Sequence, residues 1–109
     1  MSLTASLVFP YPIAKVCTLD LVRCTPVEYA TGPSQTVTGT VYVNGSPTSI
    51  VLTITTPAGG AVNQILTDVQ DNTHTAILNP GDVVTVQWTQ TNFATGSLVK
   101  MYMHMHFSE

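Results

Sequence analysis

The residues best suited to chemistry lie near the C-terminal end of the chain, in the run from Leu98 to Phe107. If this run is a β-strand, its side chains alternate between two faces, and Tyr102, His104 and His106 share one of them. Successive side chains on that face stand about 6.6 Å apart, so the two imidazoles could bind one metal ion. His74 is the only other histidine, and the acidic residues are dispersed along the sequence. We therefore predict neither a metal site nor a cofactor.

The opposite face of the same run carries the apolar side chains Met101, Met103, Met105 and Phe107. Thioethers favour Cu(I), but methionines and histidines on opposite faces of one strand cannot easily bind a single ion. Methionine also fills irregular gaps in hydrophobic cores. We expect the methionine face to pack on the core, and the other face, which includes Lys100, to meet solvent or another subunit.

No arrangement of residues typical of an enzyme is found. Serines are present, but no Gly-x-Ser-x-Gly sequence surrounds any of them, and no carboxylate pair of glycosidase type can be identified. The glycines lie at expected turns rather than in a phosphate-binding loop. The sequence therefore favours a protein without catalytic activity.

The two cysteines, Cys17 and Cys24, are seven residues apart in a segment with strand character. In an uninterrupted strand this odd spacing places them on opposite faces, separated by about 23 Å of extended chain. A disulfide between them would need a hairpin, and no Gly, Pro or Asn lies between them to form one. We expect two free, mostly buried thiols, as in a reducing compartment.

The composition indicates a β-protein with very little surface charge. Of the 109 residues, 18 are threonine and 14 are valine, whereas only 8% are charged; ordinary soluble domains carry about 25% charged residues. The polar surface is therefore either covered by partners or binds something neutral. The net charge is −3 and the basic residues are scattered, which argues against nucleic-acid binding because phosphate contacts need grouped Lys and Arg.

Neither a membrane span nor a secretory leader is expected. No segment approaches the ~18–20 uninterrupted apolar residues of a spanning helix. The N-terminus has no basic stretch followed by an apolar run.

Alternating apolar and polar residues predict a series of short strands joined by turns. Asn44-Gly45 predicts a type I′ hairpin turn, and Asn79-Pro80-Gly81-Asp82 predicts a type II turn. The segment 61–72 has apolar residues at helical spacing, but its context favours a strand, or a strand and loop, over a helix. A loop is expected at 30–34, after the first long strand ends at Thr25-Pro26. The predicted strands are Ile13–Cys24, Gln35–Val43, Thr48–Thr56, Thr73–Leu78, Val83–Thr91 and Ser97–Phe107.

The first twelve residues form either an extended N-terminal arm laid on a neighbour or an edge strand of the domain itself. Pro10 and Pro12 fix their own φ angles and favour extended conformations in the residues before them. The apolar residues that could contact another subunit here are Leu7, Val8, Phe9 and Tyr11. The remaining residues, 13–109, are expected to form one β-sandwich domain.

Trp88, the single tryptophan, permits two interpretations. It could stack on a sugar ring at the surface, or it could lie in the core or an interface, as aromatics in small β-domains more often do.

About seven or eight strands at intervals near twelve residues predict an all-β, single-domain antiparallel β-sandwich or jelly roll.

One segment carries a resemblance to a known family. The run Leu78-Asn79-Pro80-Gly81-Asp82-Val83-Val84-Thr85-Val86, followed by a Thr/Gly-rich loop and a last apolar strand, resembles the turn and closing strands of small jelly-roll accessory proteins of phage virions. The resemblance covers Leu78 to Phe107. It implies a small β-domain that forms trimers and sits on a capsid or at a fibre tip, with no catalytic residues.

Composition and resemblance together lead us to expect a virion structural protein, most simply a capsid decoration or cement protein. It would be made in the host cytoplasm, form a homotrimer and contact the major capsid protein at the virion surface. Its contacts would involve the N-terminal apolar residues together with Tyr102, His104 and His106. The alternative is a carbohydrate- or receptor-binding module, such as a fibre tip, that uses Trp88 or a tyrosine to stack on a glycan.

Overall fold

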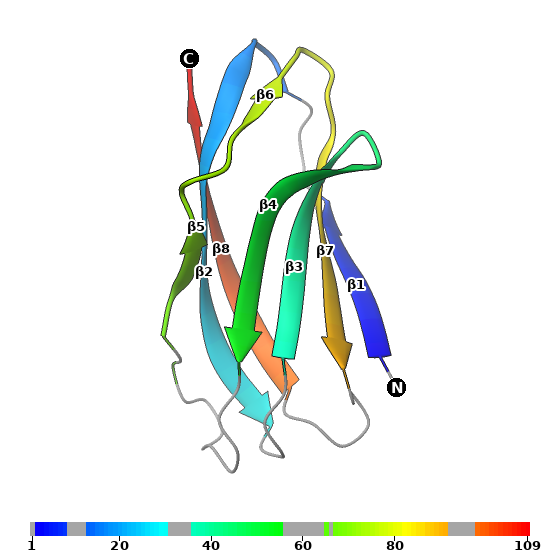
Figure 1. Cartoon of the computed structure of the whole chain (residues 1–109), viewed down its shortest axis with the longest axis vertical. Helices are drawn as coiled ribbons and strands as arrows, with labels where there is room; N and C mark the ends of the chain where they lie inside the picture. Colours follow the sequence, from blue (N-terminus) through cyan, green and yellow to red (C-terminus); the bar gives the residue numbers. More distant parts are fainter. Residues whose placement is uncertain (1, 9–12, 31–35, 56–64, 66, 92–97) are drawn as a thin grey trace.

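In a computed structural model, the chain forms two antiparallel β-sheets packed face to face (Figure 1). The structure describes residues 2–8, 13–30, 36–55, 65, 67–91 and 98–109. Their strands are β1 (Ser2–Val8), β2 (Cys17–Ala30), β3 (Thr36–Val43), β4 (Ser46–Thr55), β5 (Val69–Asp71), β6 (Ala76–Leu78), β7 (Val84–Thr91) and β8 (Leu98–Ser108). The predicted all-β sandwich is confirmed. The strand pairings do not confirm a jelly roll.

The first sheet, sheet A, has the strand order β1-β7-β3-β4. β1 pairs with β7 in a single register from Ser2 opposite Thr91 to Val8 opposite Thr85. Of the two alternatives for the start of the chain, residues 2–8 therefore form an edge strand of this sheet.

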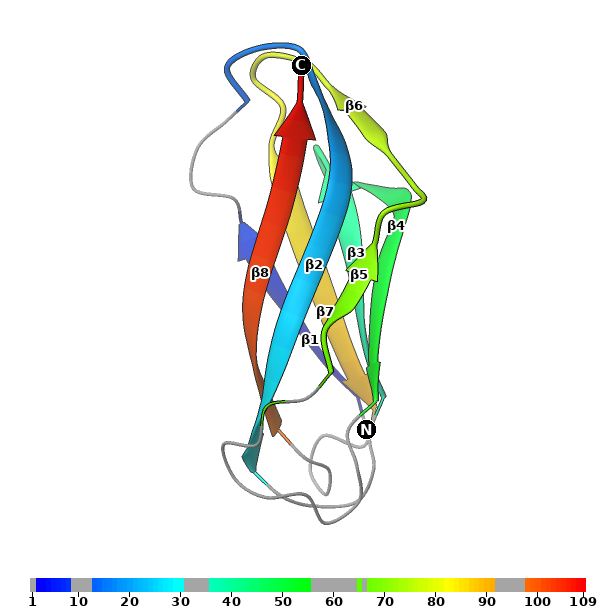
Figure 2. The ribbon, with the colours of Figure 1, turned by 90° about the vertical axis from the view of Figure 1, so that its left-hand side faces the viewer.

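The second sheet, sheet B, is built around the long strand β2. β8 pairs along one side of β2, and the short strands β6 and β5 pair one after the other along its opposite side. In Figure 2 these four strands face the viewer, with sheet A behind them. The outer surface of sheet B is therefore made mainly by β2 and β8.

The prediction that the first long strand ends at Thr25-Pro26 is wrong, because β2 continues through Pro26 to Ala30. Pairing with β5 stops at Cys24, so among the described residues Pro26 is paired with β8 but not with β5. A proline lacks the amide hydrogen for a second ladder but is tolerated where a strand has one open edge. Of the expected loop at 30–34, only Ala30 lies within the described residues, and it ends β2.

The segment 61–72 contributes strand and loop in its described part, as favoured from the sequence. Ile65 makes an isolated bridge and Val69–Asp71 forms β5. Residues 61–64 and 66 lie outside the described residues, as does Thr56, the expected last residue of the strand Thr48–Thr56.

The core lies between the two sheets and follows the predicted alternation. In β4, Ile50, Leu52 and Ile54 are buried while the residues between them are exposed. The buried apolar side chains are Leu19, Val22, Cys24, Val37, Val41, Ile50, Leu52, Ile54, Leu78, Val84, Val86 and Trp88.

Both predicted turns are confirmed by their backbone angles. Asn44 and Gly45 have φ values of 51° and 82°, as a type I′ turn requires. Gly81 has φ 88°, and the amide of Asp82 donates to the carbonyl of Asn79 at 3.0 Å, as in a type II turn.

Within the described part of the chain, no helix is long and apolar enough to cross a membrane.

Candidate functional site

The C-terminal strand presents its polar side chains on the outer face of sheet B. Tyr102, His104 and His106 are exposed, and Tyr102 retains 64% of its surface accessible to solvent. The alternate residues Met103, Met105 and Phe107 are half-buried against the core. For residues 102–107, the predicted division into an outward polar face and an inward apolar face is confirmed.

The register of β2 against β8 determines which β2 side chains lie beside Tyr102 and His104. Thr25 lies opposite Tyr102 and Arg23 lies opposite His104. On the other side of β2, Gln70 of β5 lies opposite Arg23. Neighbouring strands are about 5 Å apart and alternate residues along a strand about 7 Å apart, so Arg23, His104, Thr25 and Tyr102 form the corners of a small exposed rectangle.

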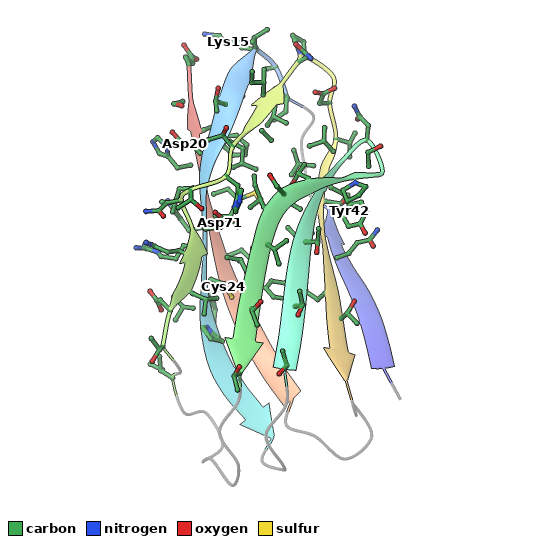
Figure 3. All side chains as sticks on the ribbon, viewed as in Figure 1. Lys15, Asp20, Cys24, Tyr42 and Asp71 are labelled. Atoms are coloured by element: carbon green, nitrogen blue, oxygen red, sulfur yellow. The ribbon has the colours of Figure 1, made fainter. Side chains whose placement is uncertain are left out.

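One histidine of the row has a carboxylate partner. His106 Nδ1 lies 2.7 Å from Asp20 Oδ1, and because a carboxylate only accepts hydrogen bonds, this ring nitrogen carries the hydrogen. Hydrogen bonds from His106, and then from Ser108, lower the pKa of Asp20. Figure 3 shows Asp20 on the sheet B side of the molecule. Asp20 is therefore held in its ionised form as the acceptor of these hydrogen bonds.

Arg23, by contrast, has no ion-pair or hydrogen-bond partner among the described side chains. The pairing of Lys15 with Glu109 at 3.6 Å lies elsewhere, at the end of the sandwich where the chain terminates (Figure 3). Asp68, the exposed carboxylate just before β5, lies on the side of β2 away from β8. Arg23 is thus a cation without a partner among the described side chains, in a chain with a net charge of −3.

A second carboxylate–histidine pair lies where β5 approaches β4 of the other sheet. Asp71 is 8% exposed and accepts hydrogen bonds from the Val51 amide at 3.2 Å and from His74 Nδ1 at 2.8 Å. The amide and hydroxyl of Thr73 and the amide of His74 also donate to it. Burial alone would raise the pKa of Asp71, but the hydrogen bonds from His74, Val51 and Thr73 outweigh burial and lower it to about 2. With its hydrogen-bonding capacity occupied, Asp71 has a structural role: it joins the two sheets.

Apart from the exposed Val51, the described outer face of sheet A is polar, and it carries no charge. Thr53, Thr38 and Thr89 lie directly opposite one another across β4, β3 and β7. None of these hydroxyls hydrogen-bonds to another described residue. We call this surface the threonine face; its described members are Thr36, Thr38, Thr40, Tyr42, Thr53, Thr55, Thr85, Gln87 and Thr89.

Trp88 does not belong to any surface site. It is only 6% exposed and its ring lies over Gly39, which is directly opposite it on β3. The stacking role considered for Trp88 is therefore wrong, and the alternative core position is correct. The alternation of β7 points this side chain inward together with Val84 and Val86.

Both cysteines are free, as predicted, but they do not lie on opposite faces. Cys24 is buried in the core and Cys17 is half-buried against it. The register of β2 shifts between Leu19 and Leu21, and this bulge reverses the alternation between the two cysteines. Burial, and then the charge of Asp68, raise the pKa of the Cys24 thiol to about 11, so it is unreactive at neutral pH.

The remaining predicted contact residues are at the N-terminus. Leu7 and Val8 belong to β1, opposite Val86 and Thr85 of β7, and Phe9 and Tyr11 lie outside the described residues. Sequence reasoning missed Arg23 as a site residue. Its position in an alternating segment is visible in the sequence, but its proximity to His104 depends on the pairing of strands 81 residues apart.

Among the described residues, no group of three or more His, Cys, Asp or Glu side chains converges to hold a metal ion. The arrangement on sheet B is suited to binding, because it offers exposed hydrogen-bond donors and an exposed aromatic ring. Comparison with protein-family models, curated proteins and solved structures finds no match for this chain.

Proposed function

We propose that the protein is a non-enzymatic structural subunit of a virion, most simply a capsid decoration protein. The observation that carries the proposal is the threonine face, whose described side chains on β3, β4 and β7 include no charge and no internally paired hydroxyl. A surface of this kind suits a partner that covers it.

A face without charges can be covered by a partner at a low cost in desolvation free energy. Burying a charged side chain carries a large desolvation penalty, whereas hydroxyl groups lose little when they find hydrogen-bond partners across an interface. The edge strands β1 and β4 of the same sheet add backbone groups that can pair with a neighbouring strand. Copies of the chain, or the capsid surface, supply these partners.

The resemblance of the segment from Leu78 to Phe107 to phage virion accessory proteins supports the same proposal. In this chain the segment contains the type II turn, β7 and β8, and it therefore contributes strands to both sheets. The described surface also favours binding over catalysis. We accordingly propose a homotrimer located on the virion surface.

The proposal predicts a defined assembly in solution and a specific way to disrupt it. Light scattering should give a mass close to three times 11.6 kDa. Thr53→Lys places a charge on the threonine face and should reduce both this mass and attachment to the capsid, because the new ammonium must be desolvated.

Gln70→Lys is the matched control, because it introduces the same charge at an exposed position on the outer face of sheet B. It should leave mass and capsid attachment unchanged. A monomeric wild type that fails to bind capsids, or equal effects of the two lysines, would contradict the proposal.

A further inference from the structure

We propose that the outer face of sheet B binds an acidic sugar, with Arg23 and His104 holding its carboxylate or sulfate and Tyr102 packing against its ring. This site lies on the sheet opposite the threonine face, so the inference does not depend on the virion role. It assigns a ligand class to residues that the tertiary structure brings together.

The distribution of charge is the first step. The chain contains only three Lys and Arg residues, yet one of them, Arg23, stands opposite His104 on an exposed surface. Arg23 has no partner among the described residues, so its donors are available to a ligand. A guanidinium presents its donors in a planar fork that matches a carboxylate or sulfate. A free arginine beside a histidine in an acidic protein therefore points to an anionic ligand.

The exposed ring of Tyr102 favours a sugar as the molecule that bears the anionic group. Its side chain is 64% exposed, whereas Trp88 is buried and cannot serve as a stacking surface. Thr25 lies opposite Tyr102 and Gln70 lies opposite Arg23, which adds hydroxyl and amide groups on the same face. The face thus offers an aromatic ring, neutral hydrogen-bonding groups and the guanidinium of Arg23. Neighbouring members of this set are within about 7 Å of one another, a spacing that suits a single acidic sugar ring.

Two carboxylates define where the anion sits. Asp20 is hydrogen-bonded to His106 at 2.7 Å, so its carboxylate is already held by a side chain of β8. Asp68 precedes β5, on the side of Arg23 away from β8, and would repel an anion there. The acidic group of the ligand therefore lies on the β8 side of Arg23, against His104.

The test uses the full-length 11.6 kDa protein, labelled with nitrogen-15 for NMR titration. The probes are sialic acid-terminated, glucuronic acid-terminated and sulfated oligosaccharides, each compared with its neutral parent. We expect one or more acidic series to bind, the neutral parents to be silent, and the shifted amide signals to map to β2 and β8 around Arg23 and Tyr102. The series that binds identifies the acidic group.

Substitutions then separate this site from general attraction to the protein. Arg23→Gln and Tyr102→Ala should each weaken binding about tenfold or more, because each removes a principal contact. Lys15→Gln removes the same charge at the end of the sandwich, and Tyr42→Ala removes an aromatic side chain from the threonine face. Both controls should stay within about twofold of wild type. Equal thermal midpoints would show that all four variants remain folded.

Several results would overturn the inference. They are the absence of binding by every acidic probe, equal binding of the neutral parents, equal losses in Lys15→Gln and Arg23→Gln, or equally tight binding of an oligoglutamate peptide. Each would leave the virion proposal standing, because the solution mass and the Thr53→Lys variant test sheet A. Conversely, a failed capsid test would not affect the sugar titration.

Discussion

At the scale of single residues, Gly39 and Trp88 pack closely against each other in the core. The two residues are directly opposite on β3 and β7, and the indole ring occupies the space that a side chain at position 39 would need. Only glycine leaves this space free. The buried tryptophan thus depends on a residue that a sequence pattern of alternating valines and threonines does not single out.

Gly39→Ala should therefore destabilise the fold. The added Cβ would lie 2.7 Å from Trp88 ring carbons, which forces the ring or the strand to move. Overpacking of this kind costs about 1–3 kcal/mol of unfolding free energy, measurable by urea denaturation. Thr40→Ala, at the neighbouring half-exposed position, is the control and should change stability by less than about 0.5 kcal/mol. A Gly39→Ala protein as stable as wild type would contradict this packing.

The charge of Asp71 contributes to the stability of the fold. Its pKa is about 2 in the folded protein against an ordinary value of 3.8. A carboxyl with a lowered folded pKa contributes stability above its unfolded pKa, and this contribution is lost as the pH falls through its folded pKa. Stability should therefore decline between about pH 4 and about pH 2 as Asp71 takes up its proton.

Asp71→Asn should lower the unfolding free energy at pH 7 by about 1–3 kcal/mol, because it removes charge-assisted hydrogen bonds to His74 and Val51. It should also flatten the decline in stability between pH 4 and pH 2, as measured by denaturant titration at each pH. The exposed Asp68→Asn serves as the control and should keep the wild-type acid profile. Identical profiles for wild type and Asp71→Asn would assign the acid sensitivity to another group.

At the scale of elements, one end of the sandwich is held by a network between two turns. Asn44 Nδ2 donates to Asp82 Oδ1 at 2.8 Å, and the amide of Val83 donates to Asn44 Oδ1 at 2.9 Å. Hydrogen bonds from the Asn79 amide, and then from Asn44, lower the pKa of Asp82. The Ile13 and Asp82 backbones are also joined, so the β3–β4 hairpin, the turn before β7 and the chain entering β2 are fixed together.

Asn44→Ala should weaken this end by about 1–3 kcal/mol, because it removes both side-chain hydrogen bonds and because alanine tolerates a φ of 51° less well than asparagine does. Asn44→Gly loses the same hydrogen bonds but accommodates the positive φ. The difference between the two variants in thermal or urea unfolding therefore measures the turn conformation alone. Asn72→Ala, at an exposed site outside the network, should be neutral, and an equal loss there would show that the network contributes nothing specific.

At the scale of the whole molecule, the two sheets present chemically different outer faces. Sheet A exposes threonine hydroxyls without charge, whereas sheet B exposes Arg23, His104 and Tyr102. A surface covered by partners benefits from few charges, and a surface that selects an anion needs one or two well-placed cations. Sheet A thus presents a neutral outer face, whereas sheet B carries Arg23 together with Asp20.

The sequence alone determined the features that depend on neighbouring residues. The alternation in β3, β4 and β8 and the two glycine-containing turns follow from local sterics and period-two burial, and all were predicted. It also placed Tyr102 and His104 on one outward face. The errors arose where a local rule was overridden: a bulge reversed the alternation between Cys17 and Cys24, and Pro26 was accommodated where β2 has one open edge.

Only the tertiary structure decided which strands are neighbours and in which register. Arg23 meets His104, and Asp20 meets His106 across 86 residues of sequence, because β2 pairs with β8. The pairing of β3 with β7 likewise places the buried ring of Trp88 over Gly39. Pairing of distant strands depends on the packing of the whole core and on the register of each edge, which no local pattern contains. For this reason the strand face of the candidate site could be predicted, but its cationic residue could not.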